Sequence, residues 1–165
     1  MTSLEIRQDD LTGPEIAALL QEHLDEMYRI TPPESVHALD LKELRQPSVT
    51  FWSAWLDGEL VGCGALKEMD ACSAEIKSMR TSLGHRGRRV GSRVLEHILE
   101  TAAARGYSRL YLETGSQEEF APARGLYERY GFGYRGPFGD YVEDPNSVFM
   151  TRRLAPEGVC VRQGR

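Results

Sequence analysis

Apolar residues recur at helical spacing in four parts of the chain, which predicts four helices. The first is amphipathic and begins at Pro14, since proline is favoured in the first turn of a helix. A break at Thr31-Pro32-Pro33 separates it from a second helical stretch, which Pro47 ends. The first expected helix extends from Pro14 to Met27, and the second includes Leu39, Leu41 and Leu44. The third and fourth are Val90–Arg105 and Ala121–Tyr130.

Alternating or continuous apolar runs predict six strands between and around these helices. The dipeptide Asp57-Gly58 stands between two of them and is a strong hairpin signal. The expected strands are Leu4–Arg7, Val49–Leu56, Leu60–Leu66, Glu75–Thr81, Arg109–Thr114 and Val148–Met150. The resulting order, β-α-α-β-β-β-α-β-α-β, is typical of an α/β fold in which helices flank a mixed sheet.

The size of the chain favours one domain. Its 165 residues, 41% of them hydrophobic and 27% charged, suffice for one buried core but are few for two domains. We expect the domain to span residues 1–154. Residues 155–165 contain proline and glycine without periodicity, which predicts a flexible tail.

Charge and targeting signals narrow the classes of function. A formal net charge of −5 argues against a general nucleic-acid binder. The N-terminal segment MTSLEIRQDD contains acids and no apolar run, and no segment is long enough to cross a bilayer, so we expect a cytoplasmic protein without a membrane partner. Cys63, Cys72 and Cys160 are widely spaced, which indicates reduced thiols, and the scattered histidines predict no metal site.

The richest chemistry lies where the strand Glu75–Thr81 runs through a turn into the third helix. The turn carries three arginines and a glycine, and a second glycine follows in the first helical turn. The first N–H groups of a helix lack intrahelical partners and lie at the positive end of its dipole, so this turn is suited to bind a phosphate. The alternative is a solvated connection. The spacing matches neither a P-loop nor a dinucleotide-binding fingerprint.

With its flanks, the turn resembles the acetyl-coenzyme A motif of the GNAT superfamily of N-acetyltransferases. The motif reads Arg or Gln, two residues, Gly, one residue, and Gly or Ala, and it falls here on Arg86, Arg89 and Gly91. The chain departs at the middle position, where Arg89 replaces glycine. The backbone N–H groups supply most of the phosphate binding, so a side chain that points away from the ligand is compatible with it.

A second block strengthens the resemblance. The superfamily ends its domain with a helix reading A-x-x-L-Y, followed by Gly-Phe at the next strand, and this chain has Ala123, Leu126, Tyr127, Gly131 and Phe132 at those places. The asparagine that many members carry seven residues before the tyrosine is Phe120 here. The two motifs and the strand between them cover about half of the chain.

The resemblance implies the single-domain GNAT fold, with a mixed, mostly antiparallel sheet flanked by helices, and acetyl-coenzyme A as the co-substrate. The main chain of Met79 and Thr81 would pair with the pantetheine amides as an added strand, and the turn would hold the pyrophosphate. The implied cofactor-binding residues are Met79, Thr81, Arg86, Gly87, Arg88, Arg89, Val90, Gly91, Ser92, Phe120 and Arg124.

Two residues are candidates for catalysis. A primary ammonium must lose a proton before it attacks a thioester, and Glu75 is the candidate base, directly or through water. Strand alternation is expected to place Glu75 on the same face as Lys77, Met79 and Thr81; the alternative is that Glu75 merely pairs with Lys77 or another cation. Tyr127 stands where the resemblance implies the proton donor to the leaving thiolate, and its alternative is a core tyrosine with a satisfied hydroxyl. The backbone N–H near Met79 would meet the developing oxyanion.

The acceptor is the least determined part of the prediction. We expect a primary amine on a small or amino-acid-like molecule, with Tyr28, His37 and Tyr141 as candidate contacts, and a homodimer is possible. The runner-up acceptors are a protein lysine or N-terminus. The other class of function is a coenzyme A-binding regulatory module without turnover, since a fold does not guarantee activity.

Overall fold

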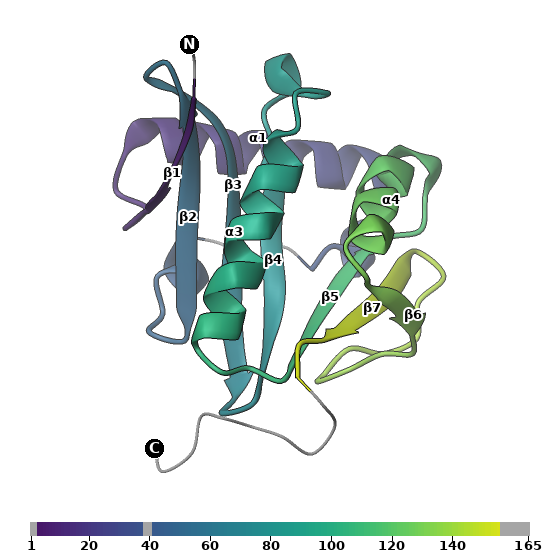
Figure 1. Cartoon of the computed structure of the whole chain (residues 1–165). Coiled ribbons are helices and arrows are strands. Elements are labelled where there is room, and N and C mark those ends of the chain that lie inside the picture. Colours follow the sequence, from purple (N-terminus) through teal and green to yellow (C-terminus); the bar gives the residue numbers. More distant parts are fainter. Residues whose placement is uncertain (1–2, 38–40, 156–165) are drawn as a thin grey trace.

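The chain folds around one seven-stranded sheet in the computed structural model, which describes residues 3–37 and 41–155 (Figure 1). The strand order is β1-β2-β3-β4-β5-β7-β6, and every neighbouring pair is antiparallel except β4 and β5. The strands are β1 Leu4–Gln8, β2 Val49–Leu56, β3 Glu59–Asp70, β4 Ser73–Thr81, β5 Arg109–Gly115, β6 Gly133–Arg135 and β7 Ser147–Arg153. This confirms the predicted mixed, mostly antiparallel α/β fold.

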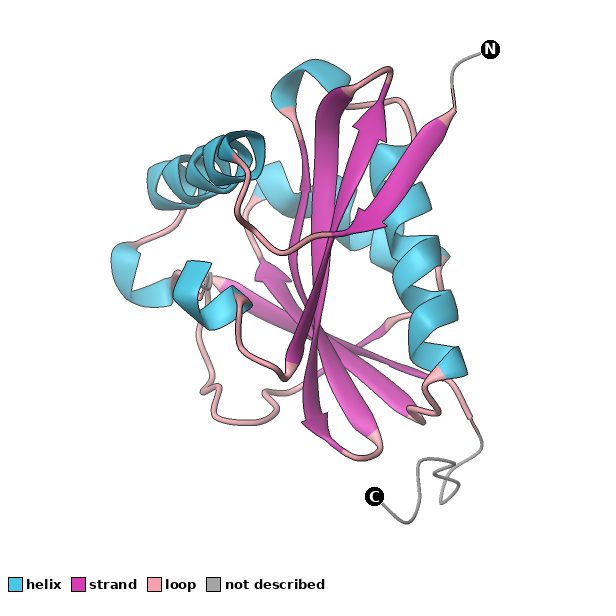
Figure 2. Ribbon diagram, turned by 90° about the vertical axis from the view of Figure 1, so that its left-hand side faces the viewer, coloured by secondary structure: helices cyan, strands magenta, loops and turns pink. Residues whose placement is uncertain are grey.

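Helices cover both faces of the sheet (Figure 2). The α-helices are α1 Pro14–Ile30, α2 Leu41–Leu44, α3 Val90–Ala104 and α4 Ala121–Arg129, and short 3-10 turns are η1 Pro33–Ser35, η2 Leu83–His85 and η3 Glu118–Phe120. One core cluster joins the sheet to α3 and α4, and includes Val94, Ile98 and Tyr127. A second joins the other face of the sheet to α1 and α2, through residues such as Ile16, Leu20 and Leu44.

The hairpin between β2 and β3 forms where Asp57-Gly58 predicts it. Asp57 has φ 53° and Gly58 has φ 79°, so both central residues lie in the left-handed region that a two-residue hairpin turn requires. The predicted helix and strand positions are otherwise reproduced to within a few residues, apart from the differences described next.

A bulge in β4 corrects the predicted face of two side chains. Cys63 of β3 pairs with Arg80 and Ala65 pairs with Lys77, so β4 has one extra residue here, and Ser78 has φ 57°. Before the bulge, Glu75 and Lys77 share the face toward α1. After it, Met79 and Thr81 turn toward α3: Met79 joins the core cluster against that helix, and Thr81 lies beside Gly91. Simple alternation was therefore wrong in placing all four on one face.

The same bulge lies where β4 and β5 separate. Their parallel pairing covers only four residue pairs, from Ser73↔Arg109 to Ile76↔Leu112. Beyond Ile76 the edge of β4 that faces β5 is left open, and the two strands diverge toward α1 and α4 (Figure 1). The fold thus creates a gap in the middle of the sheet.

Three segments of the structure differ from the predicted elements or lie partly outside the described residues. A short strand, β6, precedes β7; the apolar pattern did not predict it, because its three residues are all exposed, although the family resemblance implied a strand near Gly131 and Phe132. The second predicted helix is present as α2 and, upstream, the turn η1, whereas Leu39 lies outside the described residues. The predicted flexible tail is also outside them, except for residue 155.

The prediction that all cysteines are reduced thiols is wrong for Cys72, which is disulfide-bonded. Spacing in the sequence could not reveal this, because a disulfide depends on which cysteines the fold brings together. Cys63 is free and buried, and burial raises the pKa of its thiol to about 12. The thiol therefore stays protonated and unreactive, and the side chain serves as part of the core. Cys160 lies outside the described residues. Among residues 3–37 and 41–155, no helix is long and apolar enough to cross a membrane.

Candidate functional site

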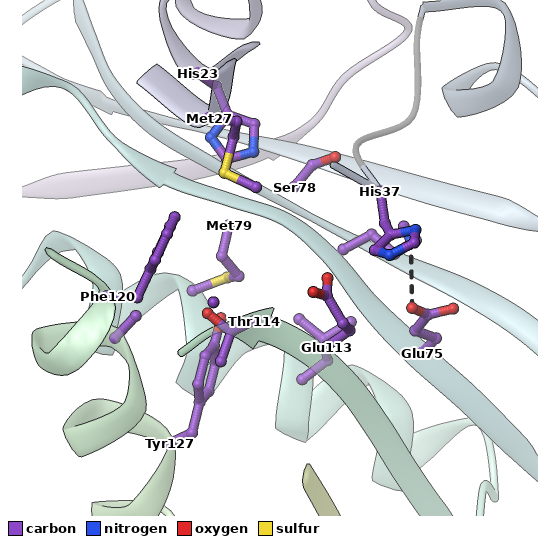
Figure 3. Close-up of a pocket in the computed structure, with 14 residues that line it drawn as sticks. His23, Met27, His37, Glu75, Ser78, Met79, Glu113, Thr114, Phe120 and Tyr127 are labelled. Carbon is purple, nitrogen blue, oxygen red and sulfur yellow. Dashed lines mark hydrogen bonds and ion pairs between the residues drawn. The ribbon is translucent and has the colours of Figure 1, made fainter. Parts of the chain in front are cut away.

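A cavity of about 110 Å³ occupies the gap between β4 and β5, with α1 and α4 closing it (Figure 3). Its walls combine carboxyl, ammonium and imidazole groups with apolar side chains. The lining residues are His23, Met27, His37, Glu75, Ile76, Lys77, Ser78, Met79, Glu113, Thr114, Gly115, Phe120, Ala123 and Tyr127. Both predicted catalytic residues are among them.

Glu75 is buried and already holds two partners. Lys77 Nζ lies 3.2 Å from Glu75 Oε2, the ion pair drawn as a dashed line in Figure 3. The Tyr141 hydroxyl donates a 2.6 Å hydrogen bond to the same oxygen, and Lys77 Nζ also donates to that hydroxyl at 2.8 Å. The ion pair that was the alternative reading of Glu75 is therefore present. Tyr141, a predicted acceptor contact, stands behind Glu75 and is not among the lining residues.

Glu113 of β5 is a second carboxyl group in the cavity, and the sequence analysis missed it. Its carboxyl group points into the open space (Figure 3), and the Ser147 hydroxyl donates a 2.8 Å hydrogen bond to its Oε2. Burial raises the pKa of Glu113 to about 7, although the hydrogen bond from Ser147 opposes the shift. The available signal was an acid in the alternating strand RLYLET, close in sequence to the helix that carries Tyr127.

Tyr127 of α4 is buried, and its hydroxyl points toward the cavity (Figure 3). The ring packs edge-on against Phe132, with the centroids 5.8 Å apart. Within residues 3–37 and 41–155 the hydroxyl has no hydrogen-bond partner, unlike the satisfied core tyrosine of the alternative reading. Burial, and then the charge of Glu113, raise the pKa of Tyr127, so it keeps its proton at neutral pH.

Two histidines complete the polar wall. His23 of α1 has its pKa lowered to about 4, first by burial and then by Arg80, so its ring is neutral at pH 7. His37 also has a lowered pKa, chiefly through burial and then the charge of Lys77, and its ring meets that of Tyr141 edge-on at 5.0 Å. Tyr28, the third predicted acceptor contact, is 54% exposed and does not line the cavity.

The predicted phosphate turn lies beyond the bulge, where β4 leads through η2 into α3. Gly87 has φ 83° and Arg89, the N-cap of α3, has φ 65°, so the chain reverses sharply before the helix. Arg88 and Arg89 are exposed, whereas the side chain of Val90 is buried in the core, which leaves its main chain as the group that can face a ligand.

Close packing and one ion pair hold this turn. A Cβ on Gly91 would lie 3.4 Å from Leu126 and 3.6 Å from Thr81 Oγ1, so α3 begins close to the end of β4. The half-exposed Arg86 pairs with Glu26 of α1 at 2.8 Å. The turn and Thr81 are thus brought together, apart from the cavity that holds Glu75 and Tyr127.

The other predicted cofactor contacts lie along the gap. Met79 and Phe120 line the cavity, and the Phe120 ring covers Gly115 so closely that a Cβ there would stand 2.1 Å from it. Arg124 donates hydrogen bonds of 2.7 and 2.9 Å to the carbonyl oxygens of Gly115 and Gln117, which ties the end of β5 to α4. Among the residues that the structure describes, no cluster of side chains is suited to a metal ion.

Comparison with known proteins agrees with this geometry. The family model described as "Acetyltransferase (GNAT) family" matches residues 16–132. The chain is 58% identical over 151 residues to the uncharacterized N-acetyltransferase YsnE of Bacillus subtilis, with 92% of this chain and 100% of that protein covered. It is 47% identical over 149 residues to the uncharacterized N-acetyltransferase YedL of Escherichia coli, with 90% and 94% covered.

A solved structure shares the fold. A putative acyl-CoA N-acyltransferase from Klebsiella pneumoniae superposes with a TM-score of 0.74 at 29% identity, and the match covers 92% of this chain and 97% of that one. The matched family model, the relatives and the shared fold lead to one assignment. The chain belongs to the GNAT family, whose members are acetyl-CoA-dependent N-acetyltransferases.

Proposed function

We propose that this enzyme transfers the acetyl group of acetyl-CoA to a primary amine on a small acceptor, by direct attack of the amine on the thioester. The observation that supports this proposal most is that one cavity contains both the carboxyl group of Glu113 and the hydroxyl of Tyr127, which has no hydrogen-bond partner among the described residues. A base for the ammonium and an acid for the leaving thiolate are the two groups that such a transfer needs.

The co-substrate would lie along the open edge of β4. Past Ile76 this edge is not paired with β5, so the main chain of Met79 and Thr81 is available for an extended ligand to add as a strand. Residues 86–92 form the turn before the fifteen-residue helix α3 and the first residues of that helix, where backbone N–H groups and Arg86, Arg88 and Arg89 favour a pyrophosphate. The main-chain N–H near Met79 would stabilise the oxyanion.

The two carboxyl groups suit different roles. Glu75, the base predicted from the sequence, already accepts hydrogen bonds from Lys77 and Tyr141. Glu113 accepts one hydrogen bond, from Ser147, and its pKa of about 7 matches the working range of a general base. We therefore assign the proton transfer to Glu113, and we assign to Glu75 the positioning of Lys77 and Tyr141.

The test is release of coenzyme A thiol from acetyl-CoA in the presence of single amines, with the acetylated product identified by mass. The panel contains amino acids, small amines without a carboxylate, and peptides with a free N-terminus or lysine. We expect turnover with small amines. Turnover with peptides alone would move the acceptor to proteins, and tight coenzyme A binding without turnover on any amine would favour the regulatory module.

A further inference from the structure

Lys77 and Glu113 hold equivalent places on the two diverging strands. Ile76 and Leu112 form the last pair of β4 and β5, and Lys77 and Glu113 are the next residue on each strand. Both line the cavity, and the charge of Lys77 opposes the rise in the pKa of Glu113. The cavity therefore offers a cation on one strand and a carboxyl group on the other.

Lys77 is unusually placed for a lysine. Its side chain is only 9% exposed, and its Nζ donates to Glu75 Oε2 at 3.2 Å and to the Tyr141 hydroxyl at 2.8 Å. An ammonium has three N–H donors, so these contacts leave one of them for a ligand. A buried cation with a spare donor, in the wall of a small cavity, is suited to bind a carboxylate.

We propose that the acceptor is an amino acid, or another small molecule with a carboxylate close to its amine, that binds with its carboxylate on Lys77 and its ammonium toward Glu113. Charges then alternate along the cavity: Glu75, Lys77, the acceptor's carboxylate, its ammonium, and Glu113. Such an order compensates each buried charge by a neighbour of opposite sign. This inference rests on the proposed function and specifies its substrate class.

The orientation fits the chemistry of transfer. The acceptor's ammonium gives one proton to Glu113, and the free amine attacks the thioester carbonyl to form the C–N bond. The C–S bond then breaks, the thiolate takes a proton from Tyr127, and Tyr127 recovers one from the nitrogen of the new amide. The proton on Glu113 returns to water, so the products are the N-acetyl acceptor, coenzyme A thiol and one proton.

The competing interpretation is that Lys77 only neutralises Glu75. It predicts that the enzyme does not distinguish an amino acid from the same molecule without its charge. The two interpretations therefore separate on a ratio, kcat/KM for an amino acid over kcat/KM for its primary amide or its decarboxylated amine. A ratio is measured on one protein preparation, so partial misfolding of a variant does not change it.

The experiment measures this ratio over the common amino acids in the parent and in three variants. Lys77→Met removes the ammonium, and Glu75→Gln with Lys77→Met removes both charges of the pair. Lys42→Met, at an exposed position of α2, is the matched control. For the best amino acid, the parent and Lys42→Met should favour the charged form by about 10- to 100-fold, the size of a hydrogen bond to a charged group. Both Lys77 variants should bring the ratio close to one.

Two results would overturn the inference while leaving acetyl transfer intact: a parent that acetylates the amides or decarboxylated amines as fast as the amino acids, or a ratio that survives the loss of Lys77. If no amine turns over, the proposed function fails separately. The substrate class is then tested by calorimetric titration of the same amino acids and amides into the parent saturated with coenzyme A. Equal affinity for the amides and the amino acids would also contradict the proposal.

Discussion

The hydroxyl of Tyr141 donates a hydrogen bond of 2.6 Å to Glu75 Oε2, across 66 positions of sequence. Because Lys77 donates to the same oxygen, the carboxylate of Glu75 is bound by a cation and a hydroxyl before any substrate arrives. This network holds Glu75 in the wall of the cavity, whereas Glu113 accepts a hydrogen bond from Ser147 and burial raises its pKa to about 7.

The pH dependence of activity should therefore follow Glu113. The pKa of Glu113 is about 7, so kcat/KM for an amine acceptor should rise with pH through that value as the base ionises. Glu113→Gln cannot accept the proton, and its activity should fall by about 100- to 1000-fold with the limb near pH 7 lost. The measurement is a pH–rate profile at saturating acetyl-CoA.

Glu75→Gln is the matched control for that profile. It should lower kcat/KM through a disturbed Lys77 and Tyr141, yet keep the limb near pH 7. If the Glu113 variant and the parent give superimposable profiles while Glu75→Gln loses the limb, the base is Glu75 and the assignment to Glu113 is wrong. A limb that shifts with the acceptor's own pKa in every protein would point to titration of the amine instead.

Stability should report the same group without any substrate. The carboxyl of Glu113 titrates at about 7 in the folded protein and near 4.5 in the unfolded chain, so the native state holds the extra proton between these values. The free energy of unfolding should therefore decrease as pH rises through that window. Glu113→Gln lacks this dependence and should gain on the order of 2 kcal/mol over the parent between about pH 5 and pH 8, measured by urea denaturation.

Acid catalysis can be tested by removing one oxygen atom. Tyr127→Phe keeps the ring contact with Phe132 but removes the hydroxyl that points into the cavity, so kcat should fall by about 10- to 1000-fold with coenzyme A binding little changed. Tyr130→Phe, which removes a hydroxyl bonded to Glu96 at 2.5 Å, is the control and should retain turnover. Equal kcat values for the parent and Tyr127→Phe, where chemistry limits the rate, would make Tyr127 a packing residue.

Periodicity and turn chemistry were sufficient to predict most of the fold. The helix from Val90 and the Asp57-Gly58 hairpin depend on neighbours in sequence, so local pattern predicts them. The bulge at Ser78 depends instead on the register of β4 against β3, and alternation alone therefore put Met79 on the wrong face.

The site was predicted in part for the same reason. Motif spacing singles out Tyr127 and the turn after β4, but the role that we propose for Glu113 rests on its burial beside β7 and on the separation of β4 and β5. The sequence around Glu113 predicts neither its burial nor the separation of the two strands. Tyr28 is on α1, the helix that contributes His23 and Met27 to the cavity, but its own side chain is exposed to solvent.

Binding at the phosphate turn should appear as thermal stabilisation. A ligand of the native state at about 100 times its Kd adds roughly 2.7 kcal/mol, so coenzyme A should raise Tm by several degrees. Gly91→Glu adds a carboxylate beside Thr81 at the start of α3 and should abolish the rise, whereas Gly91→Ala, with its nearest contact at 3.4 Å, should keep most of it. A Tm unmoved by millimolar coenzyme A in the parent would remove the turn as its binding site.

The left-handed conformation of Arg89 gives the last prediction. Arg89 is the N-cap of α3 with φ 65° and ψ 18°, a region that costs a residue with a Cβ about 1–2 kcal/mol and glycine almost nothing. Glycine also loosens the unfolded chain, so Arg89→Gly should stabilise the free enzyme by a net of about 1 kcal/mol or less, a Tm rise of about 2–4 °C. Arg88→Gly is the matched control: Arg88 lacks a positive φ, so the same change there should lower Tm. Glycine at position 89 would also restore the GNAT motif. If Arg89→Gly lowers Tm as much as Arg88→Gly does, the strain ascribed to this turn is absent.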